Sequence, residues 1–164
     1  MDKKRHVKKT LTLLRHGEAA MGQGIRNDYH RALTPDGIVQ LTRLKNLLVS
    51  SGVFFDFTLY SPAKRTTQTM ELLAEDVALG EKSADRSIYE ASLGNLLQAV
   101  HRISDSYHDV LVIGHNPGIS HLQGYLSGDS SILFVPGMLV RLSLEVDSWE
   151  MVSSSTAHVL EVIQ

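Results

Sequence analysis

The 164-residue sequence contains no cysteine, and this absence excludes disulfide bonds, thiolate nucleophiles and zinc sites built on cysteine ligands. Its basic start is not followed by a long apolar run. The run from Leu11 to Leu14 is interrupted by Thr12 and is too short for a membrane span or the core of a signal peptide. We therefore expect a protein of a reducing compartment, the cytoplasm, with no membrane partner. No metal set is expected either, since His115 and His121 are six positions apart, a spacing that does not place them on one helical face.

The sequence also lacks an excess of positive charge. Its 16 basic and 18 acidic side chains give a formal net charge of −2, which offers no electrostatic reason to bind nucleic acid or an anionic membrane. Hydrophobic residues make up 43% and charged residues 21%, as is usual in globular domains. We expect a single domain over residues 1–164, with residues 1–9 as a flexible basic leader.

Strand and helix patterns alternate along most of the chain. Apolar runs predict strands at 11–14, 54–60 and 110–114, and the unbroken run at 110–114 is typical of a central parallel strand covered on both faces. Helices are predicted where apolar residues recur at helical spacing after Pro or a capping Ser, at 35–51, 62–74, 93–103 and 117–127. Region 76–85 is expected to be a solvated connection, followed by a short strand or extended segment at 87–90.

The last part of the chain has a different pattern. Apolar residues alternate with other residues between 138 and 146, which predicts a half-exposed strand. Asp147 and Ser148 could turn the chain back into an antiparallel edge strand at 149–152, and the final residues could add another short strand. The whole pattern indicates an α/β fold with a mostly parallel central sheet and an antiparallel edge strand.

Reactive side chains follow three of the predicted strands. Arg15 and His16 end the first strand, Arg65 lies in the first turn of the helix after the second, and His115 follows the strand at 110–114. In such folds ligands bind beyond the carboxyl ends of the strands, where helix N-termini favour anions. A neutral imidazole can act as a nucleophile, and a guanidinium matches phosphate oxygens. These four residues predict one phosphoryl pocket.

The loop over residues 19–32 carries further charged or polar side chains. Arg26, Asp28, His30 and Arg31 could touch a substrate above the first strand. Solvated charges are the favoured interpretation, because the segment is rich in glycine and polar residues and its apolar residues follow neither the helical nor the strand period.

Four motifs resemble the histidine phosphatase superfamily and, within it, the small SixA-type phosphohistidine phosphatases. They are Arg15-His16-Gly17-Glu18, the helix start at 33–37, the segment 61–69 that holds Arg65, and the segment 112–117 that holds His115. The resemblance implies a three-layer αβα sandwich of the phosphoglycerate mutase type, without a metal or another cofactor. It also implies that His16 accepts the phosphoryl group, that Arg15 and Arg65 bind its oxygens, and that His115 completes the pocket.

The resemblance leaves two candidates for the general acid. In the phosphoglycerate mutase branch, a glutamate after the second arginine motif protonates the leaving group, and Glu90 occupies a comparable place; Glu18 is the alternative. Glu90 follows Arg65 by 25 positions and precedes His115 by 25, which leaves no room for the helical insertion that covers the pocket in mutase-like relatives. We therefore expect an open site.

Three functions remain open at this point. The favoured one is a phosphohistidine phosphatase that acts on a phosphorylated protein such as a histidine phosphocarrier, because an open site admits a phosphoryl group carried on a protein. The second is a phosphomonoesterase acting on sugar or nucleotide phosphates. The third, a non-catalytic phosphate-binding module, would have no need for the nucleophile. A generic nucleotide-binding domain is disfavoured, since G-x-G-x-x-G and P-loop motifs are absent.

Overall fold

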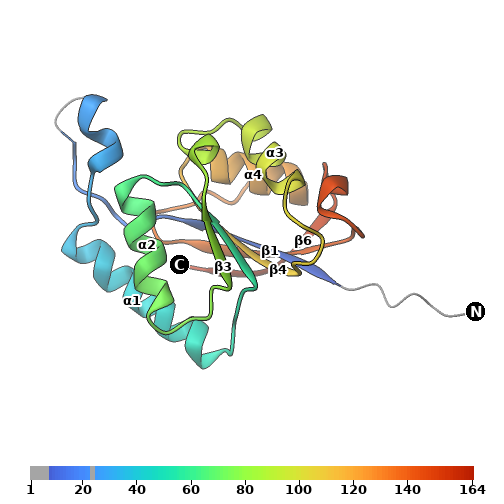
Figure 1. The fold of residues 1–164 in the computed structure, drawn as a ribbon, viewed down its shortest axis with the longest axis horizontal. Helices are drawn as coiled ribbons and strands as arrows, with labels where there is room; N and C mark the ends of the chain where they lie inside the picture. Colours follow the sequence, from blue (N-terminus) through green and yellow to red (C-terminus); the bar gives the residue numbers. More distant parts are fainter. Residues whose placement is uncertain (1–7, 23–24) are drawn as a thin grey trace, which may run out of the picture.

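The computed structural model describes residues 8–22 and 25–164, and a six-stranded sheet forms its centre (Figure 1). The strands are β1 (Lys9–Arg15), β2 (Phe57–Tyr60), β3 (Glu81–Ala84), β4 (Asp109–Gly114), β5 (Leu139–Leu144) and β6 (Ala157–Ile163). Their order is β3-β2-β4-β1-β5-β6, in which the first four are parallel and β5 and β6 are antiparallel to their neighbours. The predicted mostly parallel α/β sheet is confirmed, and its antiparallel part comprises two strands.

Helices cover both faces of the sheet and complete three layers (Figure 1). The helices are α1 (Pro35–Ser50), α2 (Lys64–Ala74), α3 (Leu93–His101) and α4 (Gly118–Ser127), with short 3-10 helices η1 (Ile25–His30), η2 (Arg86–Ile88) and η3 (Trp149–Met151). One buried cluster joins α1 and α2 to the sheet, and a second joins α3 and α4 to the opposite face. Because both faces are covered, β1 and β4 are buried almost throughout, as the apolar run at 110–114 predicts.

Two predictions for the middle of the chain are wrong. The region 76–85, predicted as a solvated connection, contains β3, a polar edge strand that pairs with β2 through its backbone and therefore shows no hydrophobic period. The segment 87–90, predicted as extended, begins inside η2 instead. The Asp85 side chain caps this 3-10 turn by accepting a hydrogen bond from the Ser87 backbone N–H at 2.8 Å.

The antiparallel edge also differs from its prediction. Residues 149–151 form η3 rather than a strand, because Trp149 turns inward and is fully buried. Its backbone N–H donates to the Asp105 carboxylate and its indole N–H donates to the Tyr107 carbonyl. The outer strand is β6, formed by the last residues, and Lys9, predicted to lie in the leader, begins β1 with a buried side chain. Residues 1–7 of that leader lie outside the described residues.

Two helices begin later than predicted, and the second strand does too. The strand predicted at 54–60 starts at Phe57, α2 starts at Lys64 and α4 starts at Gly118. Ser61 and Asn116 are the residues that the sequence offers as caps before Pro62 and Pro117. Ser61 Oγ accepts from the Ala63 backbone N–H at 3.3 Å and also lies 2.8 Å from His115 Nε2, whereas Asn116 Nδ2 donates to the Phe134 carbonyl at 2.8 Å. Within residues 8–22 and 25–164, no helix has the length and apolar character required to cross a membrane.

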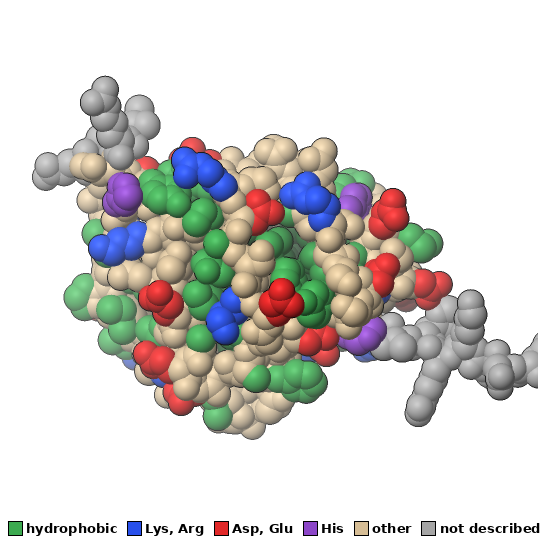
Figure 2. Space-filling model, in the orientation of Figure 1, with side chains coloured by type: hydrophobic (Ala, Val, Ile, Leu, Met, Phe, Trp, Pro, Cys, Tyr) green, Lys and Arg blue, Asp and Glu red, His purple; other side chains and the backbone are tan. Residues whose placement is uncertain are grey.

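The surface seen in Figure 2 has no region of a single charge. Acidic and basic side chains are interspersed over this face, and hydrophobic side chains reach the surface between them. This distribution agrees with the net charge of −2.

Candidate active site

The sheet register brings the predicted site residues together. In the parallel pairing of β1 with β4, Arg15 lies opposite Gly114, so the residues that follow, His16 and His115, are neighbours. Their ring centroids are 5.2 Å apart. Arg65, in the first turn of α2, is buried and reaches the same point. The pocket therefore collects side chains from three adjacent parallel strand ends.

The tautomer of His16 is fixed by its own neighbour. Its Nδ1 lies 2.7 Å from the Gly17 carbonyl oxygen, which can only accept, so Nδ1 carries the proton. The Nε2 atom therefore presents a lone pair, to which the Arg65 Nε–H donates at 3.2 Å. Burial, together with the charges of Arg65 and Arg15, lowers the pKa of His16 to about 4, although the Gly17 hydrogen bond opposes this. His16 is thus neutral near pH 7, with the electron pair that a nucleophile needs.

His115 is also held neutral, with Ser61 as its partner. The Ser61 hydroxyl accepts from the Ala63 backbone N–H at 3.3 Å and lies 2.8 Å from His115 Nε2. We assign the Ser61 hydroxyl as the donor and His115 Nε2 as the acceptor of this hydrogen bond, so that the ring proton of His115 lies on Nδ1. This Nδ1 is buried and has no hydrogen-bond partner in the described part of the chain. Burial first, and then the charge of Arg65, lower the pKa of His115 to about 3.

Arg15 is anchored by the segment before β5. Its Nη1 donates to the Phe134 carbonyl at 2.8 Å, and the Asn116 side chain donates to the same oxygen. Burial, followed by the neighbouring charge of Arg65, lowers the pKa of Arg15. Its Nε–H is buried without a hydrogen-bond partner among the residues that the structure describes. The pocket therefore contains two unsatisfied buried groups, Arg15 Nε and His115 Nδ1, that an anionic oxygen could satisfy.

Asp28, interpreted from the sequence as a solvated charge, instead holds Arg65 in place. Arg65 Nη1 donates to the Asp28 carbonyl at 2.7 Å, and Nη2 donates to its carboxylate at 3.2 Å. The Tyr89 hydroxyl donates to the same carboxylate oxygen at 2.5 Å, and Arg31 Nε donates to the other at 3.0 Å. Burial tends to raise the pKa of Asp28, but Tyr89 and Arg65 outweigh it and the net pKa is lowered. The solvated interpretation of Asp28 and Arg31 is therefore wrong.

The two candidate general acids lie in different surroundings. Glu90 is exposed and lines a cavity of about 520 Å³ together with His115 and Pro117. Glu18 is exposed too, but its carboxylate accepts from the Thr34 hydroxyl at 3.2 Å, at the start of α1. Of the two, Glu90 shares a cavity wall with a site histidine.

Sequence reasoning missed three further participants. The position of Ser61 directly after a strand end is a signal that its side chain could face the pocket as well as cap a helix. Tyr89 precedes the candidate Glu90 in the sequence. Burial, and then the hydrogen bond to Asp28, raise the pKa of Tyr89 to about 12. The Phe134 group that binds Arg15 is a backbone carbonyl, which no side-chain pattern can reveal.

The described residues contain no group of three or more His, Cys, Asp or Glu side chains placed to hold a metal ion. The pocket is instead rich in hydrogen-bond donors, namely the guanidinium groups of Arg15 and Arg65 and the His115 imidazole, beside the lone pair of His16. Such a set suits an oxyanion of phosphate size.

Comparison with known proteins places this arrangement in a family. The sequence model of the histidine phosphatase superfamily (branch 1) matches residues 11–116, from β1 to the residue after His115. The chain belongs to the histidine phosphatase superfamily. Members of this superfamily are phosphatases, and the stretch that matches contains all the predicted site residues.

Similar proteins of this superfamily support the same fold. Two uncharacterized proteins of Mycobacterium tuberculosis, Rv1276c of strain H37Rv and MT1313 of strain CDC 1551, are 31% identical over 109 residues, which is 66% of this chain and 66% of each relative. The proposed phosphohistidine phosphatase SixA of Nakamurella multipartitia is similar in structure, with a TM-score of 0.82, 26% identity and 96% of each chain covered. The structure of the protein histidine phosphatase SixA complexed with tungstate has a TM-score of 0.80 at 22% identity, and the match covers 94% of this chain and 96% of that chain. The predicted three-layer fold of the phosphoglycerate mutase type is confirmed.

Proposed function

We propose that this protein is a phosphohistidine phosphatase that uses His16 as its nucleophile. The observation that carries the proposal is the His16 Nε2 lone pair, which the hydrogen bond from Nδ1–H to the Gly17 carbonyl leaves free and which lies 3.2 Å from Arg65 Nε. An imidazole in this tautomer can attack phosphorus without first losing a proton. The surrounding arginines can bind the oxygens of the group under transfer.

The reaction then has two displacement steps. His16 Nε2 forms a bond to phosphorus as the N–P bond of the substrate phosphohistidine breaks, and the departing imidazole takes up a proton. Water next attacks the phosphorus on His16, which releases inorganic phosphate and returns the neutral ring. While Nε2 is phosphorylated, the ring carries additional positive charge, and its Nδ1–H donates a charge-assisted hydrogen bond to the Gly17 carbonyl.

The arginines have free donors for this chemistry. A guanidinium has five N–H groups, and the bonds of Arg65 to His16 and Asp28 use three of them, which leaves two for phosphoryl oxygens. When the phosphoryl group occupies His16 Nε2, the Nε–H of Arg65 is released to a phosphoryl oxygen as well. Arg15 Nε and His115 Nδ1 supply the unsatisfied donors. These are positioned before the reaction, which is what stabilises the charge of the transition state.

A protein substrate is favoured over a small ester by the open site that the spacing of Arg65, Glu90 and His115 predicts and by the relatives of SixA type. Glu90, exposed at a cavity beside His115, supports the second candidate, a phosphomonoesterase. A similar structure with a TM-score of 0.71 and 19% identity is that of a proposed alpha-ribazole-5'-P phosphatase from Escherichia coli, with 95% of this chain and 96% of that chain covered.

A substrate panel tests the proposal. It consists of a phosphorylated histidine phosphocarrier, a phosphoserine peptide and a sugar phosphate, each assayed with and without EDTA. We expect the highest kcat/KM for the phosphocarrier and no loss with EDTA. Preference for the sugar phosphate would establish the second candidate. Phosphate binding without turnover of any substrate would establish a binding module.

A further inference from the structure

A groove leads away from the candidate active site along α4. The cavity of about 520 Å³ that contains Glu90 and His115 shares lining residues with a neighbouring cavity of about 530 Å³. The shared residues are Leu93, Asn116, Pro117 and His121. The two cavities are therefore parts of one continuous depression, named here the α4 groove, which runs from His115 to the segment before β5.

The far end of the α4 groove is apolar and exposed. Its apolar lining residues are Tyr125, Ile132 and Leu133, together with Ser120, Gly124 and Ser130, and no Lys or Arg is among the lining residues of either cavity. Leu133 is 75% exposed, and Val135, two positions further on, is 46% exposed. A single exposed apolar side chain is common on protein surfaces. Here, however, the exposed leucine belongs to a groove that continues into a phosphoryl pocket, which indicates a binding role.

The wall that carries Leu133 is fixed relative to the pocket. Phe134, between Leu133 and Val135, is 2% exposed, and its carbonyl accepts from Arg15 and Asn116 at 2.8 Å each. Its backbone N–H donates to the Ser120 hydroxyl at 3.2 Å. The exposed leucine is therefore held on a segment that contacts a phosphate-binding arginine directly. A preformed surface of this kind loses little conformational freedom when a partner binds.

We propose that the α4 groove docks the protein that carries the phosphohistidine, by taking up apolar side chains that flank the phosphorylated residue. The proposal rests on the proposed function, since it assumes that the substrate is a protein. A phosphoryl group and its imidazole would occupy the pocket at His115 and leave the distal cavity empty. Only a substrate whose polypeptide chain continues beyond the phosphohistidine can also fill that cavity. The lining of the distal cavity contains no Lys, Arg, Asp or Glu, so apolar contact, rather than charge, is the basis of recognition there.

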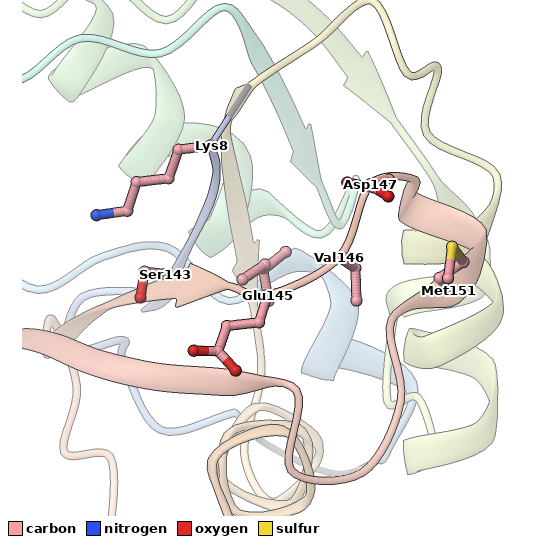
Figure 3. Close-up of a pocket in the computed structure, with 7 residues that line it drawn as sticks. Lys8, Ser143, Glu145, Val146, Asp147 and Met151 are labelled. Atoms are coloured by element: carbon pink, nitrogen blue, oxygen red, sulfur yellow. The ribbon is translucent and has the colours of Figure 1, made fainter. Parts of the chain in front are cut away.

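The test compares a protein substrate with a small one. Leu133→Ser is assayed on the phosphorylated histidine phosphocarrier and on free phosphohistidine, with Leu133→Met as the conservative variant. Met151→Ser is the matched control, because Met151 is 58% exposed but lies in a cavity near the start of β1 and the end of β5 (Figure 3). That cavity is at the opposite end of β1 from Arg15, about 20 Å away for a strand of this length.

We expect Leu133→Ser to raise KM for the phosphocarrier about tenfold, the size given by losing the burial of one leucine side chain. Free phosphohistidine should be turned over at an unchanged rate, and Leu133→Met and Met151→Ser should behave as the wild type on both substrates. An unchanged KM for the phosphocarrier, or equal losses on both substrates, would overturn the groove proposal while leaving the proposed function intact. A wild-type protein that turns over neither substrate would overturn both.

Discussion

Among the side chains of the site, Arg65 has the most demanding proposed role, because it contacts the nucleophile and is proposed to bind the phosphoryl oxygens. It contacts the His16 lone pair and is buried at the start of α2. We expect Arg65→Ala to reduce kcat by about 10²–10³-fold, as for the loss of one preorganised donor in a transition state. Arg65→Lys should recover little of the lost kcat, because a lysine ammonium lacks the planar pair of N–H donors that a guanidinium offers to phosphate oxygens. Lys64→Ala, at the exposed neighbouring position, is the control; a wild-type rate for Arg65→Ala would contradict the proposed pocket.

Substitution of Glu90 should distinguish the two classes of substrate. The imidazole that leaves phosphohistidine has a reference pKa of about 6.5 and needs little protonation, whereas an alkoxide is far more basic. We expect Glu90→Gln to retain most phosphohistidine turnover and to lose about 10²–10⁴-fold on alkyl phosphoesters. Steady-state kcat/KM on both substrates measures this. Equal losses would make Glu90 a positioning residue, and a selective loss in Glu18→Gln instead would transfer the acid role to Glu18.

The junction between β1 and α1 shows how closely the elements meet at the site. A Cβ atom on Gly37, in the first turn of α1, would lie 2.3 Å from the carbonyl oxygen of Glu18, two residues after His16. Gly37→Ala must therefore push the helix away from the loop that carries the nucleophile. We expect a loss of about 1–3 kcal/mol in the free energy of unfolding, together with a lower kcat.

Gly94 offers a matched control for this prediction. It lies in the first turn of α3, and a Cβ atom there would meet only Ser92 Oγ, at 3.8 Å. Denaturant melts of Gly37→Ala and Gly94→Ala would compare the two sites. Equal stabilities for the two variants would show that the contact between Gly37 and Glu18 is not a close one in solution.

Elements also differed in how well the sequence predicted them. The buried strands β1 and β4 and the helices that follow could be predicted, since burial on both faces produces an unbroken apolar run. The edge strand β3 could not, because its residues are polar and its pairing with β2 is made by the backbone. In the site, Arg15, His16, Arg65 and His115 come together as expected from strand ends. The role of Asp28 required knowledge of how η1 folds back over α2, a tertiary contact that no local pattern encodes.

The stability of the whole molecule should depend on pH through the two buried histidines. His16 and His115 have pKa values of about 4 and about 3 in the folded protein, against about 6.5 in an unfolded chain. The unfolded state therefore binds more protons as the pH falls below 6.5, and folded stability is lost from pH 6.5 down to about 4 through His16 and down to about 3 through His115. From pH 7 to pH 5 we expect a loss of about 2 kcal/mol for each histidine.

Urea melts of the wild type and of His115→Gln at pH 7 and pH 5 would measure this dependence. The variant should lose less stability than the wild type over that interval, because one titrating group has been removed. An identical pH dependence in both proteins would show that His115 is not held neutral in the folded state.

The measurement that bears most directly on the whole account is the capture of the phosphorylated enzyme. The protein is mixed with a labelled phosphohistidine substrate, quenched in alkaline denaturant to preserve N–P bonds, digested and mapped by mass spectrometry. The account predicts a phosphoryl group on His16, formed and lost within a turnover, and none in His16→Ala, which should also be inactive. A phosphoryl group on another residue, or turnover that persists in His16→Ala, would contradict it.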